Sequence, residues 1–336
     1  MTLLKPLHGA PPGLEEMLAR ALEQDYPASV QMICGLQSAL DPARDVVERL
    51  QRRFPNREIV LVIDSRQHGA NRKISNLINM MGAAKHDLIV VADADIVAPR
   101  NWLSAVAAAF TTTRVGVVSC FYSGEGETFW SRLGAMGISY QFLPNAVLGT
   151  AMRMTAPCFG ATMALRRDTL AAIGGFQSLC DCLADDFELG RSVRARGFDL
   201  AYAAVLVRHR CVEASPASLW NHEFRWARTI RTVNLAGHWS SVITHTLPLA
   251  LMGTVLLDFS SASMLALVAV LVSRFLLKFL VDRAAGFRTG AFWLMPVRDL
   301  LAFAVFLASL MGGMEVSWRG DRFRIEKGGA ISQVIG

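Results

Sequence analysis

The sequence predicts an α/β protein whose mainly parallel sheet is followed by C-terminal membrane helices. Three observations support this prediction. Short apolar segments alternate with helical patterns over the first half of the chain, and long apolar stretches begin at about residue 240. Hydrophobic residues make up 52% of the 336 residues and charged residues only 18%. Because soluble domains carry about 25% charged residues, we expect part of this chain to lie in lipid.

The first half of the chain is expected to form the sheet. Strands are predicted over residues 2–4, 30–35, 59–63 and 87–92, and helices over 13–23, 42–53 and 74–82. The strands are continuously apolar and lie between helices, which is typical of a parallel sheet covered on both faces. In such sheets ligands bind beyond the carboxyl ends of the strands.

The C-terminal part is expected to meet the membrane. Residues 242–259 and 264–281 are each about as long as a bilayer crossing requires, whereas the apolar stretch at 300–314 is shorter. The loop after the second apolar stretch and the C-terminal tail are both basic, so the positive-inside rule places both in the cytosol. Two spans followed by a re-entrant or interfacial third segment satisfy this arrangement. The basic residues concerned are Arg283, Arg288, Arg298, Arg319, Arg322, Arg324 and Lys327.

These patterns divide the chain into three parts. Residues 1–238 form the α/β domain, 239–314 the membrane-embedded region and 315–336 a cytosolic basic tail. Residues 128–148 are either an amphipathic segment lying on the membrane or an ordinary core helix.

The 34 Lys and Arg exceed the 28 Asp and Glu, giving a formal charge of +6. No basic run typical of RNA or DNA binders occurs, so no nucleic-acid partner is expected.

Two carboxylates follow the predicted strand at 87–92. Asp93 and Asp95 are two residues apart, so both can reach one divalent cation, such as Mg²⁺ or Mn²⁺. A cation held there would bridge the two phosphates of a nucleotide and neutralise a departing diphosphate. Such triplets also occur in ordinary turns, and the buried strand directly before this one favours the metal site.

An acidic run at residues 185–188 follows Gly174 and Gly175. A carboxylate there could accept the proton of an attacking hydroxyl group. The alternative is an acidic helix N-terminus, where aspartate is favoured by the helix dipole.

Residues 222–226 read His-Glu-Phe-Arg-Trp, and Arg228 and Arg231 follow. An arginine beside an aromatic residue suits pyrophosphate binding combined with stacking. The alternative is a basic interfacial helix that precedes the first span.

The ordered set of these motifs resembles the family-2 glycosyltransferases, and within them the ceramide glucosyltransferase-like group. The bacterial hopanoid-biosynthesis glycosyltransferase is the most similar branch. The resemblance runs through residues 4–9, 41–46 and 71–77, the carboxylates described above, and the Arg-Trp pair. It also includes residues 318–320, Trp-Arg-Gly, in the tail. His222 departs from the pattern, which has Gln or Arg at that position.

The resemblance implies a GT-A fold, the fold of nucleotide-diphospho-sugar transferases, and an inverting reaction. It implies that Asp186 is the catalytic base and that Asp41 and Lys73 hold the uridine side of the donor. It places Asp93 at the donor diphosphate together with the metal, which Asp95 also holds. Arg225 and Trp226 are expected to close over the pyrophosphate.

The implied reaction moves a hexose or N-acetylhexosamine from a UDP-sugar to a hydroxyl group of a membrane lipid, with a hopanoid polyol and UDP-GlcNAc as the first candidates. Alternatives are ceramide glucosylation with UDP-glucose, and transfer to polyprenyl phosphate or a growing polysaccharide. A non-catalytic membrane scaffold is the alternative from another class. The expected location is the bacterial inner membrane, with several crossings and the catalytic domain in the cytosol.

Overall fold

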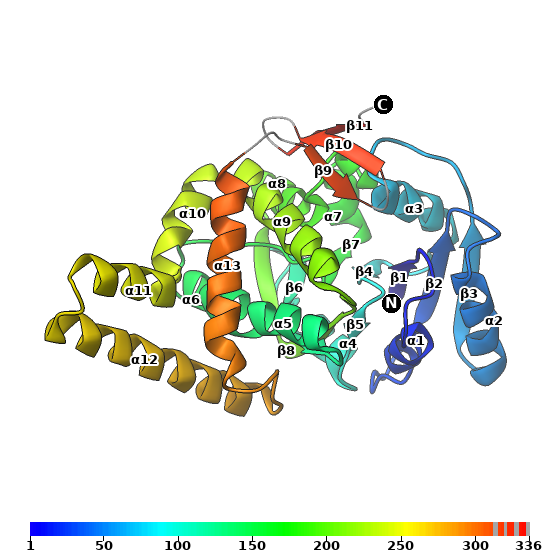
Figure 1. The fold of residues 1–336 in the computed structure, drawn as a ribbon. Helices are drawn as coiled ribbons and strands as arrows, with labels where there is room; N and C mark the ends of the chain where they lie inside the picture. The colour runs from blue at the N-terminus through cyan, green and yellow to red at the C-terminus, as the bar shows by residue number, and fades with distance from the viewer. Residues whose placement is uncertain (312–314, 319–320, 326–328, 334–336) are drawn as a thin grey trace. The chain divides into compact units, whose positions relative to one another are not determined.

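A computed structural model describes residues 1–311, 315–318, 321–325 and 329–333. The chain forms two compact units (Figure 1). The first comprises residues 1–122 and 146–209, and the second residues 123–145 and 210–336. The second unit therefore includes residues 210–238, which we expected within the transferase domain.

The main sheet has eight strands in the order β3-β2-β1-β4-β7-β6-β8-β5. The four strands at the β3 end are parallel, with Leu4 opposite both Ile33 and Val91, whereas β7 is antiparallel to β4 and to β6. The strands are β1 Thr2–Pro6, β2 Gln31–Leu36, β3 Glu58–Ile63, β4 Leu88–Val91, β5 Ile96–Val97, β6 Val115–Gly126, β7 Met163–Arg166 and β8 Asp199–Cys211.

Helices cover both faces of this sheet, as the sequence predicts. Neighbouring strand residues alternate between two hydrophobic cores: Leu3 and Met32 belong to one, and Leu4 and Ile33 to the other. The first core includes α1, α2 and α4, and the second α3, α7 and α8. These helices are α1 Leu14–Leu22, α2 Ala43–Arg53, α3 Arg72–Met80, α4 Trp102–Ala108, α7 Arg167–Ala172 and α8 Asp185–Ala195, with the short turns η1 Met81–Ala83 and η3 Phe176–Leu179.

The second unit is largely helical. Leu133, Met136 and Tyr140 lie in its core beside Leu294, which favours the core-helix interpretation of residues 128–148. The elements are α5 Phe129–Gly137, η2 Ile138–Phe142, α9 Pro216–Val233, α10 Leu235–Ser240, η4 Ser241–Thr244, α11 Thr246–Leu256, α12 Ser261–Ala285, α13 Leu294–Leu310, β9 Glu315–Trp318, β10 Asp321–Ile325 and β11 Ile331–Gln333; α6, Leu143–Ala151, crosses between the units.

The apolar C-terminal helices differ partly from the expectation. Among the described helices, α12 is long and apolar enough by itself to cross a bilayer. The segment expected as an uninterrupted span at 242–259 is broken at His245, where α11 is bent by 62° from the helical segment before it. Pro248 in the first turn of α11 lacks an amide N–H and obstructs the carbonyl of Thr244, so the helix restarts there. The third apolar segment is α13, which begins before Pro296, and Met314 lies outside the described residues.

Charged side chains inside the second unit are paired. Lys278 is completely buried and donates hydrogen bonds to Tyr140 Oη at 2.7 Å and Asp282 Oδ2 at 2.9 Å. Arg274 Nε donates to Asp299 Oδ2 at 2.7 Å. Because burying an unpaired charge is costly, these pairs explain how an otherwise apolar helix carries Arg274 and Lys278.

Candidate active site

Charged side chains meet beyond the carboxyl ends of β1 and β4 in the first unit. Lys73 Nζ lies 2.9 Å from Asp93 Oδ1 and 3.1 Å from Asp185 Oδ2. Lys5, which is 1% exposed, donates a hydrogen bond from Nζ to the backbone carbonyl of Asp93 at 2.9 Å. The expected site residues Lys73 and Asp93 are thus brought together, at the edge of the sheet where the sequence places a ligand.

The loop before α3 explains how segments distant in sequence meet here. The Asn71 side chain accepts a hydrogen bond from Ile74 N at 3.1 Å and so caps α3, which holds Lys73 in its first turn. Asn71 Nδ2 donates to the carbonyl of Cys182 at 2.7 Å, and Ala70 N donates to Asp181 Oδ1 at 2.8 Å. These bonds hold the segment that leads into α8 against the start of α3.

Asp186 stands in the first turn of α8. Its Oδ2 accepts a hydrogen bond from Gly160 N at 2.9 Å and its Oδ1 accepts one from Phe187 N at 2.8 Å. A Cβ atom at Gly160 would lie 3.3 Å from Asp93 Oδ2 and 3.4 Å from Asp186 Oδ2. Both carboxylates therefore border the same space, and glycine at position 160 keeps that space open.

Burial and neighbouring charges set the protonation of this cluster. Burial, and then the negative charge of Asp185, raise the pKa of Asp186 to about 6. Burial also raises the pKa of Asp93, although Lys73 opposes the shift. For Lys73, burial alone would lower the pKa, but the carboxylates of Asp185 and Asp93 outweigh it and raise the pKa above the ordinary range. The cluster thus pairs a firmly charged lysine with a carboxylate that titrates near neutrality.

Asp95, the second carboxylate of the triplet, has a different neighbour. Its Oδ1 lies 3.4 Å from Nδ1 of His209 on β8. Within the part of the chain that the structure describes, no group of three or more His, Cys, Asp or Glu side chains could hold a metal ion. Two carboxylates still fit Mg²⁺ or Mn²⁺, because these ions are commonly held by one or two carboxylates together with substrate phosphates. Asp93 Oδ2, which borders the space beside Gly160, is the oxygen suited to this role.

Asp41 lies away from this cluster, beside a separate cavity of about 450 Å³ in the same unit. The cavity is lined by residues that follow β1, β2 and β3, among them His8, Gln37 and Gln67. Asp41 accepts hydrogen bonds from Gly9 N at 3.0 Å and Ala43 N at 2.9 Å. The carboxylate therefore ties the loop after β1 to the start of α2 and forms one wall of the cavity.

Arg225 and Trp226 lie on α9, in the second unit. The helix begins at a capping box formed by Ser215 and Ser218, with Pro216 at its first position. The Trp226 ring lies 4.4 Å from the His222 ring, and His222 Nδ1 pairs with the buried carboxylate of Glu213. His222 is therefore held between a carboxylate and an aromatic ring. The expected roles of Arg225 and Trp226 in binding a donor remain predictions.

Comparison with known proteins identifies the family. The model of glycosyl transferase family 21 matches residues 1–331. The chain belongs to this family. Family membership confirms the predicted enzyme class, a glycosyltransferase.

Individual relatives agree with the family match. A ceramide glucosyltransferase of Komagataella phaffii is 34% identical over 100 residues, which cover 29% of this chain and 19% of the relative. Ceramide glucosyltransferase 1 of Caenorhabditis elegans is 20% identical over 230 residues, covering 68% of this chain and 49% of the relative. The matched segments thus span half or less of these relatives' length.

A solved structure supports the fold. It is a mannosyltransferase of Pyrobaculum calidifontis in complex with GDP-Man and Mn²⁺, with a TM-score of 0.53 and 20% sequence identity. The match covers 92% of this chain and 86% of the other. This likeness confirms the predicted GT-A-like fold for the family 21 chain.

Several residues of this family 21 site were not singled out by sequence reasoning. Lys5, Asp185, Gly160 and His209 contact or border the predicted carboxylates. Asp185 could have been found from its place next to Asp186, and Lys5 from its place at the end of a strand. No sequence signal indicates Gly160 or His209, which reach the site only through the folding of distant segments.

Proposed function

We propose that this protein transfers a sugar from a UDP-sugar to a hydroxyl group of a membrane lipid, with inversion at the anomeric carbon. The observation that carries the proposal is the cluster of Lys73, Asp93 and Asp186 at the end of β4, in a chain of glycosyl transferase family 21. The C-terminal helices supply the membrane part of the proposal. The side chains of Leu265, Val268 and Leu276 on α12 are exposed, as a lipid-facing helix requires.

Asp186 is the proposed catalytic base. Its two backbone hydrogen bonds hold the carboxylate in one orientation, and a pKa of about 6 leaves it ionised yet basic at neutral pH. Asp185 suits the role less, because it is 7% exposed and pairs with Lys73. Asp186 accepts the proton of the lipid hydroxyl group while the oxygen of that hydroxyl group bonds to the anomeric carbon. The bond from the anomeric carbon to UDP breaks, and its electron pair leaves on UDP.

The residues expected from the sequence are proposed to hold the donor. Asp93 and Asp95 would hold Mg²⁺ or Mn²⁺, which when bound neutralises charge on the departing diphosphate. Asp41 borders the cavity proposed for the uridine side. Lys73 orients Asp93 and adds positive charge near the diphosphate. Arg225 and Trp226 are proposed to bind and cover the pyrophosphate.

The acceptor and the donor sugar are the finer part of the proposal. A hopanoid polyol with UDP-GlcNAc is the first candidate, in a bacterial inner membrane that the chain crosses more than once with its catalytic part in the cytosol. The ceramide glucosyltransferase relatives favour a second candidate, ceramide with UDP-glucose.

Product mass spectrometry distinguishes these candidates. Membranes containing the full chain are incubated with UDP-glucose or UDP-GlcNAc and with hopanoid, ceramide or polyprenyl phosphate acceptors. A glycolipid heavier than its acceptor by one sugar residue, which is the sugar less one water, is expected from a single combination. Absence of any glycosylated lipid across the panel, in membranes that contain folded protein, would overturn the lipid transfer proposal.

A further inference from the structure

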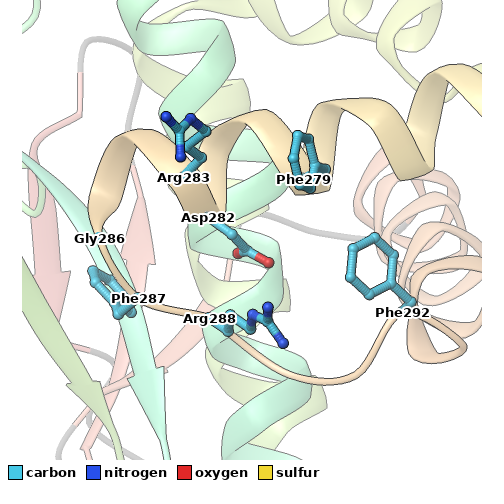
Figure 2. A pocket seen from close by; sticks show the side chains of 7 residues that line it. All are labelled: Phe279, Asp282, Arg283, Gly286, Phe287, Arg288 and Phe292. Carbon is cyan, nitrogen blue, oxygen red and sulfur yellow. The ribbon is translucent and has the colours of Figure 1, made fainter.

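A pocket lies at the carboxyl end of α12, within the second unit. Figure 2 shows it where the chain leaves α12 at Gly286 and turns toward α13. The cavity is about 320 Å³ and none of its lining residues belongs to the site described above. Its charged and aromatic lining consists of Phe279, Asp282, Arg283, Phe287, Arg288 and Phe292.

The pocket has an excess of positive charge. Arg283 and Arg288 are both exposed, and among the described residues neither has an ion-pair or hydrogen-bond partner. Asp282, the acidic residue of the lining, is already engaged with Lys278 Nζ at 2.9 Å and with Tyr140 Oη. Two arginines therefore face the pocket without a compensating acid. Guanidinium groups form bidentate hydrogen bonds with phosphate oxygens, so a phosphate is the anion that best matches the two arginines.

The rest of the pocket is apolar and continuous with α12. Phe279 is 54% exposed and Phe292 is 41% exposed, and Trp293 next to it is 67% exposed. Exposed aromatic rings beside arginines at the end of an apolar helix are typical of the level of lipid headgroups. A soluble phosphate would use only the arginines, whereas a phospholipid would also cover the rings.

We propose that this pocket binds the phosphate headgroup of an anionic membrane lipid, with Arg283 and Arg288 on the phosphate and Phe279 and Phe292 against the upper part of the acyl chains. The inference rests on the membrane association in the proposed function and does not depend on sugar transfer. Basic residues beside a membrane gain affinity from anionic lipids, so the two arginines together account for about a thirtyfold preference over a zwitterionic lipid.

Native mass spectrometry of the full chain in detergent tests this. The protein is titrated with phosphatidylglycerol, with phosphatidylcholine and with glycerol 3-phosphate, all without donor sugar. The double variant Arg283→Gln/Arg288→Gln is compared with Arg52→Gln/Arg57→Gln. The control removes the same charge from two exposed arginines of the first unit, whose side chains have no ion-pair or hydrogen-bond partner in the described part of the chain. Melting temperatures verify that each variant is folded.

The expected result is retention of phosphatidylglycerol by the wild type and by the control, and loss of the preference over phosphatidylcholine in the pocket variant. Phe292→Ala should weaken phosphatidylglycerol retention severalfold and leave glycerol 3-phosphate unchanged. Equal retention by the pocket variant would overturn the inference, as would glycerol 3-phosphate binding as tightly as the lipid. If the double variant does not fold, the loop variant Arg288→Gln alone must lose part of the preference. Because this experiment does not measure sugar transfer, its result can be interpreted even if the proposed enzyme activity is not found.

Discussion

At the scale of single residues, the site depends on how one lysine is shared. Lys73 pairs with Asp93 and with Asp185, so a single positive charge is shared between two carboxylates. Asp186 receives backbone hydrogen bonds instead, and its raised pKa follows from burial beside Asp185. We therefore propose different tasks for the neighbouring aspartates of α8, a structural one for Asp185 and a catalytic one for Asp186.

Replacing the proposed base tests this division. Asp186→Asn should lower kcat by at least about a thousandfold, because the amide cannot accept the acceptor's proton. UDP binding, measured by calorimetry, should stay within a few-fold of the wild type. Asp199→Asn, an exposed aspartate of the same unit, is the control and should retain activity. Normal turnover by Asp186→Asn would contradict the assignment of the base.

The pH profile gives an independent test. The pKa of Asp186 is raised to about 6, so the carboxyl group becomes protonated as the pH falls through 6 and can no longer accept a proton. We expect kcat/KM to fall about tenfold per pH unit below 6 and to level off above 7. A profile that is flat from pH 5 to pH 8 would show that another group carries the proton.

Metal removal tests the proposed roles of Asp93 and Asp95. A chelator should abolish transfer, because without the metal the diphosphate would depart without charge neutralisation. Added Mn²⁺ should restore transfer. Asp95→Asn should raise the Mn²⁺ concentration needed for half-maximal UDP binding. Full activity in the presence of chelator would rule out the metal site.

At the scale of elements, a buried ion pair joins α9 to α13. Arg298 Nη2 donates to Glu223 Oε2 at 2.8 Å, and Arg298 Nη1 contacts the other carboxylate oxygen. Both side chains are largely buried, and Glu223 stands two residues before Arg225. The pair therefore holds the helix that carries the Arg-Trp motif.

Breaking this pair should destabilise the second unit. Arg298→Gln leaves the Glu223 carboxylate buried without its partner, which costs about 3–5 kcal/mol. The double variant Glu223→Gln/Arg298→Gln should recover most of the loss, because no charge is then left uncompensated. Thermal unfolding in detergent measures both, with Arg20→Gln as the control, since its exposed pair with Glu16 contributes about 1 kcal/mol or less. Equal melting temperatures for Arg298→Gln and the wild type would refute the structural role of the pair.

At the scale of the whole molecule, apolar surface concentrates in the second unit. Exposed large side chains follow each other along α11 and α12, among them Val255, Leu256 and Leu265. A water-soluble protein seldom exposes a continuous apolar surface of this kind, which indicates a lipid environment.

Membrane fractionation tests this surface. The full chain should stay in the membrane pellet after washing with high salt and with alkaline carbonate, because apolar burial does not depend on charge screening. Detergent should release it. Release by salt alone would indicate electrostatic attachment and contradict insertion of α12.

Much of the first unit could be predicted from the sequence alone. Strand positions follow from continuously apolar segments, and Asp93 and Asp186 are found because each stands at a recognisable place, one after a strand and one at a helix start. The positions of α1, α2 and α3 follow from their helical spacing. These features are local, so neighbouring residues determine them. In the tail, Trp318 belongs to β9, whereas Arg319 and Gly320 of the expected motif lie outside the described residues.

Only the tertiary structure decided which charges share the site and how the apolar helices are built. Lys73 meets Asp185 because Asn71 and Ala70 are hydrogen-bonded to residues 182 and 181. Gly160 reaches the site from the turn before β7, and His209 from β8. Arg274 and Lys278 are tolerated in α12 because Asp299, Tyr140 and Asp282 satisfy them. Pairing of this kind depends on three-dimensional distance between segments far apart in the chain, which no local pattern of residues encodes.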